Sequence, residues 1–215
     1  NQGHWVLARM GKKVLRPGGK ELTNKLINGL GINEKHKVVE FAPGLGYTAS
    51  KVLNMNPLTY TGIELNEDAA QLLRKKIKGE NRSIIVANAS DTTLADNSVD
   101  IVYGEAMLTM QSPKGKRKII EEAKRILKPG GFYGIHELGL YPDEMSEESK
   151  SQIQRDLSES IKVNARPLTI KEWTNLFVEN GFTVQSVCTN AMCLLEKKRI
   201  IDDEGIFRTL KITYN

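Results

Sequence analysis

The sequence predicts an α/β fold with a doubly wound, mostly parallel sheet of about seven strands and helices on both faces. Short apolar runs rich in β-branched residues alternate with helical patterns along most of the 215 residues. A glycine-rich turn, Gly44-Leu45-Gly46, follows the first of these runs, and an acid, Glu64, ends the second. In open parallel sheets such tips lie side by side where ligands bind, so the pattern indicates a Rossmann-like sheet.

Hydrophobic periodicity and turn residues set the expected elements in order. The helix at residues 20–30, for example, has Leu22, Leu26 and Leu30 on one face and Gly31 as a stop. The remaining expected helices are residues 4–15, 47–54, 67–78 and 115–127, and the expected strands are residues 37–42, 59–64, 83–87, 99–103 and 132–137. A sharp turn is expected at Lys128-Pro129-Gly130-Gly131, after the last of these helices.

Residues 138–168 depart from this alternation. A helix expected at residues 145–163 has a narrow apolar stripe, because Ile153, Leu157 and Ile161 are spaced four apart. The segment is interpreted either as a lid inserted after the fifth strand or as an ordinary surface helix.

The C-terminal part returns to helix and strand patterns. A capping box at Thr169-Ile170-Lys171-Glu172 begins a helix that ends near Asn180. Strands are expected at residues 183–187 and 208–214. Because no linker divides the chain, we expect a single domain over residues 1–215, with residues 1–33 as a helical cap on it.

Composition narrows the class of protein. Hydrophobic residues make up 40% of the chain and charged residues 27%, and no run is long enough to span a membrane. The net charge of +5 is spread over predicted helix faces, with no platform of aromatic and basic residues, so nucleic acid is not the expected partner. With no signal peptide visible, a cytoplasmic protein is expected.

The metal-binding and redox-active residue types are few. Cys188 and Cys193 stand five apart, which fits neither a zinc pair nor a redox motif, and two half-buried thiols in a reducing compartment are expected. His4, His36 and His136 are scattered along the chain. No metal site is therefore expected.

The glycine-rich turn leaves two nucleotide classes open. Gly44-x-Gly46-x-x-Ala49 formally fits the dinucleotide fingerprint, so an NAD(P)-dependent oxidoreductase is a real alternative. Against it, Glu40 places a carboxylate where a pyrophosphate would lie, and Pro43 stiffens the loop before the glycines. The chain after the fifth strand also lacks a second mononucleotide-binding half.

A different adenosine compound fits the same positions. Glu40 suits an amino group, and Glu64, eighteen residues after Gly46, can accept hydrogen bonds from both hydroxyls of a ribose. Gly44 and Gly46 let the backbone approach a ligand closely. Adenine contacts are expected from Asn88 and Ala89, with Leu65 flanking the ring. A ligand with these three parts is S-adenosylmethionine.

On these residues the chain resembles the class I S-adenosylmethionine-dependent methyltransferases, in the branch of quinone-biosynthesis and small-molecule enzymes, over about residues 16–190. The family's first motif runs acid-x-Gly-x-Gly-x-Gly. Here it spans Glu40 to Gly46, with Ala42 in place of the first glycine. Asn88 stands where the family usually has Asp, with Asp91 nearby as a substitute.

Further segments carry the same resemblance. Residues 96–102 and 127–131 follow the family pattern, and Arg16-Pro17-Gly18-Gly19 resembles a segment that covers the methionine end of the cofactor. The resemblance therefore implies cofactor contacts at Gly19, at Ala42, at Tyr47 directly after the glycine loop, and at Glu105.

Methyl transfer needs alignment and exclusion of water, and it needs a base only when the acceptor arrives protonated. The candidates for catalysis are Glu105, after the fourth strand, and His136, at the end of the fifth, with Tyr103 and Glu137 beside them. A capping or salt-bridging role for Glu105 and a buried, hydrogen-bonded role for His136 are the alternatives.

The acceptor class is narrowed by absent motifs. Residues 103–106 read Tyr-Gly-Glu-Ala, which carries neither the polar-proline pattern of nucleobase amino-methyltransferases nor a nucleophilic cysteine. We therefore expect methyl transfer to O, N or C of a small molecule. A non-catalytic S-adenosylmethionine-binding protein remains an alternative, and the acceptor and the oligomeric state stay open.

Overall fold

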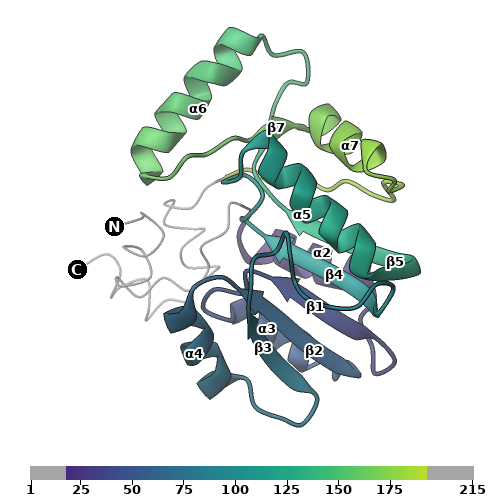
Figure 1. Cartoon of the computed structure of the whole chain (residues 1–215). Helices are drawn as coiled ribbons and strands as arrows, with labels where there is room; N and C mark the ends of the chain where they lie inside the picture. The colour runs from purple at the N-terminus through teal and green to yellow at the C-terminus, as the bar shows by residue number, and fades with distance from the viewer. Residues whose placement is uncertain (1–17, 193–215) are drawn as a thin grey trace.

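Five parallel strands form the central sheet of the computed structural model, which describes residues 18–192 (Figure 1). The order across the sheet is β3-β2-β1-β4-β5. The strands are β1 (Lys37–Phe41), β2 (Thr59–Glu64), β3 (Arg82–Val86), β4 (Val99–Glu105) and β5 (Leu127–His136). The chain winds outward in one direction from β1 to β3 and in the other from β4 to β5. The gap between β1 and β4 is thus the switch point at which open α/β sheets bind ligands.

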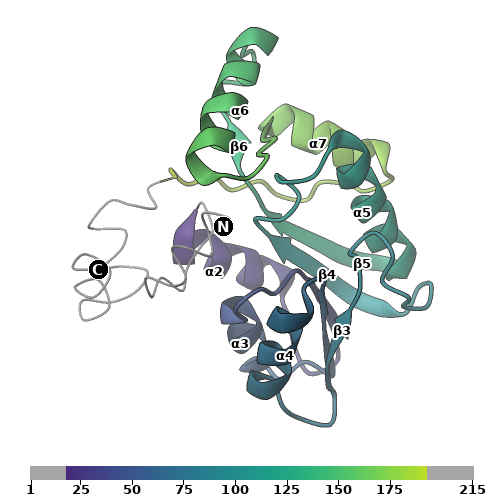
Figure 2. The same ribbon diagram turned by 60° about the vertical axis from the view of Figure 1, so that its left-hand side comes forward.

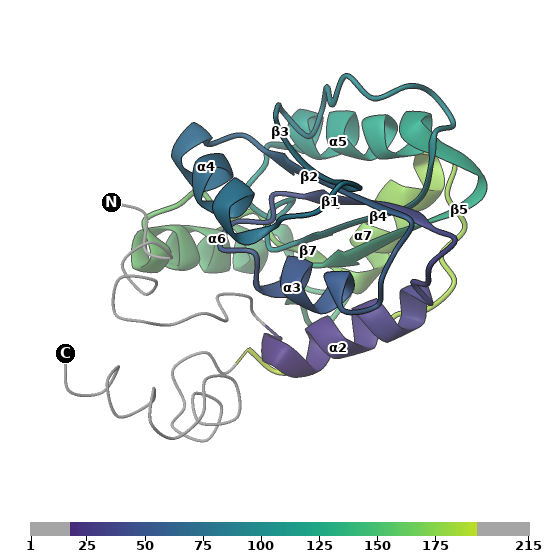
Figure 3. The same cartoon turned by 90° about the horizontal axis from the view of Figure 1, so that it is seen from below.

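Helices cover both faces of the sheet. α2 (Gly19–Leu30), α3 (Tyr47–Leu53) and α4 (Glu67–Lys76) bury apolar side chains in one core with Val38, Tyr60, Ile101 and Tyr103 of the strands. α5 (Pro113–Ile126) and α7 (Ile170–Glu179) build the second core against Val39, Phe41, Ile63 and Val102. Figure 3 shows α2 and α3 on the side of the sheet opposite α5.

Alternation along β1 explains the two cores. Val38 faces the first core, whereas Val39 and Phe41 face the second, because successive side chains of a strand point to opposite faces. Glu40 therefore points to the same side as Val38, toward α2 and α3. Alternate residues of β1 thus point to one face of the sheet, and the polar side chains of the candidate site described below lie on that face.

Residues 138–168 lie between β5 and α7 and contain β6 (Gly139–Leu140), α6 (Glu147–Ile161) and the start of β7 (Leu168–Thr169). β6 pairs with β7 in a separate two-stranded ladder that closes the base of the segment. Lys150 of α6 holds both Glu147 and Glu172 at 2.7 Å. Helix α6 stands apart from the two helical layers (Figures 1 and 2).

Most expected elements are confirmed, and the differences have physical causes. The expected strand at residues 183–187 is wrong: these residues form no strand, and no described segment pairs with their backbone. The turn expected at residues 128–131 is an irregularity within β5, where Val99 pairs with Leu127 but Ile101 pairs with Phe132. The central sheet has five strands, and β6 and β7 form a separate pair, so residues 18–192 contain seven strands in two sheets.

Some expectations concern other parts of the chain. The helix at residues 4–15, the strand at residues 208–214 and Cys193 lie outside the described residues. Cys188 is exposed rather than half-buried. None of the described helices has the length and apolar character needed to cross a membrane.

Candidate active site

Four adjacent strands each present one ionisable side chain at or near their carboxyl ends. These are Glu64 of β2, Glu40 of β1, Glu105 of β4 and His136 of β5. In the sheet register Glu40 lies between Gly62 and Tyr103, and Glu105 lies opposite His136. The ends of β1 and β2, with Glu40 and Glu64 near them, thus lie side by side, as the sequence predicts for the first two strands.

The loop between β1 and α3 turns through left-handed backbone three times. Ala42 has a φ of 51°, Gly44 of 54° and Gly46 of 69°. A Cβ at Gly46 would stand 2.8 Å from Leu73 Cδ2, whereas one at Gly44 would meet only the Ala42 carbonyl, at 4.0 Å. Gly46 is therefore required by packing, and the backbone at Gly44 faces open space that a ligand can approach.

Lys76 stabilises this loop from the last turn of α4. Its Nζ donates to the carbonyl oxygens of Leu45 and Gly46, both at 2.9 Å. Pro43 adds a turn bond, since its carbonyl accepts from the Gly46 amide at 2.9 Å. The loop is therefore held in shape from outside, with its carbonyls turned toward α4.

Glu64 reaches from the tip of β2 to the same loop. Its Oε2 accepts from the Gly44 amide and its Oε1 from the Asn66 amide, both at 3.1 Å. These two bonds fix the plane of the carboxylate. Each carboxylate oxygen has two lone-pair directions, so the group retains capacity for further donors.

Glu40 is buried and held by two tyrosines. Its Oε2 accepts from the Tyr60 hydroxyl at 2.5 Å and from the Tyr103 hydroxyl at 2.6 Å. Burial and the negative charge of Glu40 hold the pKa of both tyrosines well above their usual range. Both phenols therefore stay protonated as donors, and the carboxylate is set in place by the sheet itself.

Glu105 is the centre of a second polar cluster, with a side chain that is only 4% exposed. Its Oε1 accepts from Thr48 of α3 at 2.5 Å, and its Oε2 accepts from Thr23 of α2 at 2.6 Å. The same Oε2 lies 2.8 Å from His136 Nδ1. Glu105 thereby joins both helices of this face to the ends of β4 and β5.

The neighbours of His136 determine its tautomer. The backbone amide of Gly18 donates to Nε2 at 3.0 Å, so Nε2 carries the lone pair. The proton of the neutral ring is then on Nδ1, which donates to Glu105. Both ring nitrogens are engaged in this arrangement.

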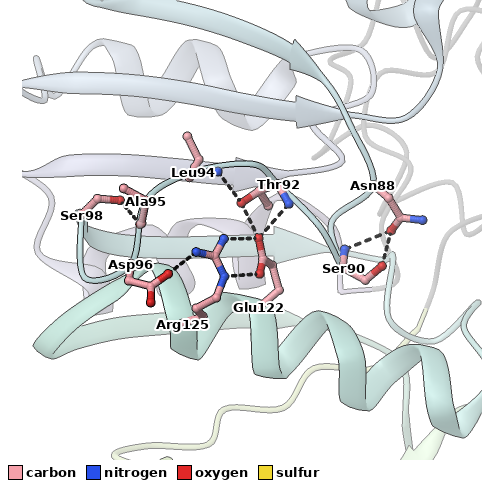
Figure 4. A network of polar contacts seen from close by, with 9 residues as sticks. All are labelled: Asn88, Ser90, Thr92, Leu94, Ala95, Asp96, Ser98, Glu122 and Arg125. Carbon is pink, nitrogen blue, oxygen red and sulfur yellow. Dashed lines mark hydrogen bonds and ion pairs between the residues drawn. The ribbon is translucent and has the colours of Figure 1, made fainter.

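Asn88 follows β3 and is exposed. Its side-chain oxygen accepts from the amide and the hydroxyl of Ser90, at 3.0 and 2.9 Å, and its amide nitrogen points away from that turn (Figure 4). Ala89 is buried beside it, whereas Leu65 is 69% exposed. Two donors and an apolar surface therefore lie at the ends of β2 and β3.

Comparisons with known proteins agree with this architecture. The family profile described as "Methyltransferase domain" matches residues 39–135, the part of the chain that runs from β1 through β5. An uncharacterized protein of Haemophilus influenzae is 37% identical over 217 residues, which cover 99% of this chain and 84% of that protein. The chain belongs to the class I S-adenosylmethionine-dependent methyltransferases.

Two more distant proteins place the methyltransferase among its relatives. The phosphoethanolamine N-methyltransferase of Plasmodium falciparum is 25% identical over 122 residues, 56% of this chain, and the match spans 46% of that protein's length. The S-adenosylmethionine-dependent methyltransferase of Mesorhizobium loti shares the fold, with a TM-score of 0.64 at 14% identity over 76% of this chain and 81% of that one.

The side chains at this edge of the sheet are chemically suited to S-adenosylmethionine. The open approach at Gly44 and the oriented Glu64 carboxylate suit a ribose, and the exposed Leu65 suits the face of an adenine ring. Three carboxylates on one edge suit a ligand that carries an ammonium and a sulfonium charge. Within residues 18–192 no three His, Cys, Asp or Glu side chains gather as metal ligands.

Sequence reasoning missed the hydroxyl donors of the site. Thr23, Thr48 and Tyr60 were not predicted as site residues, yet each donates to one of its carboxylates. Thr48 lies two residues after Gly46, so its place on the first turn of α3 was a usable signal. Thr23 and Tyr60 reach the site only through the packing of α2 and β2, which no local pattern reveals.

Glu137, the fourth candidate, does not face this cluster. It accepts from the amides of Met107, Leu108 and Thr109, at 2.8 to 3.0 Å, and from the Thr109 hydroxyl at 2.7 Å. Burial raises the pKa of Glu137 above its usual value in spite of these bonds. Glu137 therefore stabilises the loop after β4, and the polar cluster contains Glu105 and His136 but not Glu137.

Proposed function

We propose that this methyltransferase transfers the methyl group of S-adenosylmethionine to O, N or C of a small-molecule acceptor. The observation that carries the proposal is the line of Glu64, Glu40 and Glu105 across neighbouring strands, beside an open glycine loop at the switch point. Such an edge favours a cationic nucleoside over a dinucleotide, because a pyrophosphate there would face the buried carboxylate of Glu40.

The contacts that we assign follow from position. Glu64 accepts the ribose hydroxyls, Asn88 and Ala89 meet the adenine edge, and Leu65 flanks the ring. Glu40 attracts the ammonium group, directly or through water. Gly19, Ala42, Gly44, Gly46, Tyr47 and Glu105 complete the expected cofactor surface.

For catalysis, the site residues align the reactants and exclude water. S-adenosylmethionine supplies an activated methyl group when bound. Glu105 and His136 were the candidates for a base, yet the ring of His136 accepts from Gly18 and donates to Glu105. Their hydrogen bonds favour an acceptor that needs no base from this chain.

The acceptor side of the site is proposed from topology. Residues 138–168 follow β5 directly, and their base is tied by the β6–β7 ladder and by Lys150 to Glu172. We propose that this segment covers the acceptor as a lid within one methyltransferase domain. The relative from Plasmodium falciparum is named for phosphoethanolamine, which supports a small molecule as the acceptor. We also propose the cytoplasm as the compartment, because the free thiols expected at Cys188 and Cys193 suit reducing surroundings.

Calorimetric titration of the purified chain with S-adenosylmethionine, S-adenosylhomocysteine, NAD and NADP tests the cofactor. We expect binding of S-adenosylmethionine and S-adenosylhomocysteine only. Binding of NAD or NADP instead would favour an NAD(P)-dependent oxidoreductase. A screen of small-molecule acceptors with radiolabelled methyl donor then tests transfer. A chain that binds the cofactor but methylates no acceptor would support the non-catalytic alternative.

The ribose assignment has its own test. Glu64→Gln keeps the size of the side chain, and Glu64→Lys reverses its charge, so both should weaken S-adenosylhomocysteine binding, the second to below detection. Glu67→Lys is the matched control, because Glu67 is an exposed acid three residues away on α4. Unchanged affinity in Glu64→Lys would remove Glu64 from the site.

A further inference from the structure

The turn at Gly18 and Gly19 packs directly on the ring of His136. Besides the bond from the Gly18 amide to Nε2, both glycines are buried. A Cβ at Gly18 would stand 2.7 Å from that nitrogen and 2.1 Å from Leu22 Cδ1. A residue larger than glycine would clash with the ring or with Leu22 of α2, so this turn packs against the end of β5 without intervening space.

The ring is oriented in turn by Glu105. The bond between Nδ1 and Oε2 fixes the tautomer that leaves Nε2 as an acceptor for Gly18. Hydroxyl bonds from Thr23 and Thr48 fix the carboxylate. A continuous chain of hydrogen bonds therefore runs from Gly18 to Thr48, two residues beyond the glycine loop.

We propose that His136 and Glu105 are positioning residues that hold the Gly18–Gly19 turn, and with it the start of α2, against the carboxyl edge of the sheet. The proposal rests on the proposed function, in which the cofactor binds at this edge. A turn that is already in place spares the ordering free energy that a mobile segment would consume on binding. His136 and Glu105 then raise the affinity for the cofactor by holding the Gly18–Gly19 turn in place, and not by taking a proton. Gly19 of this turn is one of the expected cofactor contacts.

Two substitutions of His136 separate the two bonds of its ring. The amide of an asparagine can replace Nδ1–H toward Glu105 but is too short to reach Gly18. A glutamine extends to the position of Nε2 and can accept from the Gly18 amide. His36→Asn is the matched control, since the Nδ1 of His36 accepts from the Asn33 amide at 3.3 Å, before β1 and at the opposite end of the strands.

The experiment measures amide hydrogen exchange at Gly18 in the ligand-free protein and the affinity for S-adenosylhomocysteine by calorimetry. In His136→Asn we expect Gly18 to exchange about tenfold faster and the dissociation constant to rise about tenfold, the equivalent of one lost hydrogen bond. His136→Gln should recover part of both effects. His36→Asn should leave both values at those of the wild type.

Unchanged exchange and affinity in His136→Asn would overturn the proposal while leaving the cofactor assignment intact. If the wild type does not bind S-adenosylhomocysteine, the proposed function fails, and the exchange rate of Gly18 alone decides whether His136 holds the turn. The nitrogen resonances of the wild-type ring give a test that needs no variant. A proton on Nδ1 with a bare Nε2 is expected, and a neutral ring protonated at Nε2 would overturn the proposal.

Discussion

Thr48 donates its hydroxyl proton to Glu105 across 2.5 Å, although 57 residues separate the two along the chain. Thr48 lies on the first turn of α3, just after the glycine loop, and Glu105 ends β4. The bond therefore crosses the gap between β1 and β4 at which the sheet reverses its winding. It makes the conformation of the loop after β1 depend on a carboxylate at the end of β4.

Replacing Thr48 by valine tests this dependence, because valine has the same shape and lacks the hydroxyl. Glu105 would lose one of its donors in a buried setting, and we expect the free energy of unfolding to fall by about 1–3 kcal/mol. Urea unfolding measures it. Thr61→Val is the control, since the Thr61 hydroxyl makes a solvent-exposed hydrogen bond with Ser83 on the neighbouring strand. Equal losses in both variants would contradict a special role for the Thr48 bond.

Glu122 of α5 should control stability in acid. It accepts from the amide and hydroxyl of Thr92, at 2.7 and 2.5 Å, and pairs with Arg125, which also pairs with Asp96 (Figure 4). The Arg125 bond, followed by those from Thr92, lowers the pKa of Glu122 from 4.5 to about 2. This network ties the segment after β3, which carries Asn88, to α5.

Because folding lowers the pKa of Glu122, the ionised carboxylate stabilises the folded protein. The contribution of Glu122 is complete above its unfolded value of 4.5 and is lost as the pH falls toward 2. Because Arg125 is partly exposed and screened, we expect about 2 kcal/mol at neutral pH. Glu122→Gln should be less stable than the wild type at pH 7, and the difference should shrink toward pH 2. Glu179→Gln, at an exposed ion pair with Arg117, should change little at any pH.

Much of the fold could be predicted from local patterns in the sequence. The capping box of Thr169 and Glu172 forms as expected, and Gly31 ends α2 in a left-handed conformation. These features are local, because a cap or stop depends on residues within a turn of one another. The run at residues 183–187 shows the limit: β-propensity yields a strand only where another strand pairs with it.

The candidate site could be predicted only in part. Glu40 and Glu64 were placed at strand ends by the spacing of motif and strand. The bond from Thr23 to Glu105 joins residues 82 positions apart, and the bond from Gly18 to His136 joins residues 118 apart. Such contacts arise when α2 packs on the sheet, so a sequence read in short windows holds no signal for them.

Ala42 is where the chain departs from the glycine of the family motif, and it has a backbone φ of 51°. A left-handed conformation is unfavourable for alanine by about 1–2 kcal/mol, whereas glycine adds entropy to the unfolded chain. We expect Ala42→Gly to stabilise the protein by up to about 1 kcal/mol in urea unfolding. Ala49→Gly, in the buried face of α3, should destabilise it. A loss of stability in Ala42→Gly would show that the strain is relieved by contacts of the methyl group.

The Tyr133 hydroxyl differs from that of Tyr103, which donates to Glu40. Among residues 18–192, its hydroxyl is the buried side-chain polar atom without a hydrogen-bond partner, and its ring lies 5.5 Å from Phe177 and 5.8 Å from Phe182. Burial and the nearby charge of Glu137 raise its pKa well above the usual range, so the hydroxyl stays protonated and unsatisfied.

The same substitution should therefore have opposite signs at the two tyrosines. Tyr133→Phe removes an unsatisfied group and keeps the aromatic packing, so we expect a gain of about 1–2 kcal/mol in the free energy of unfolding. Tyr103→Phe removes a donor to the buried Glu40, and we expect a loss of about 1–3 kcal/mol. Urea unfolding of both variants gives the comparison. A loss at Tyr133 would mean that its hydroxyl is satisfied in solution, with an ordered water as the simplest partner beside Glu137.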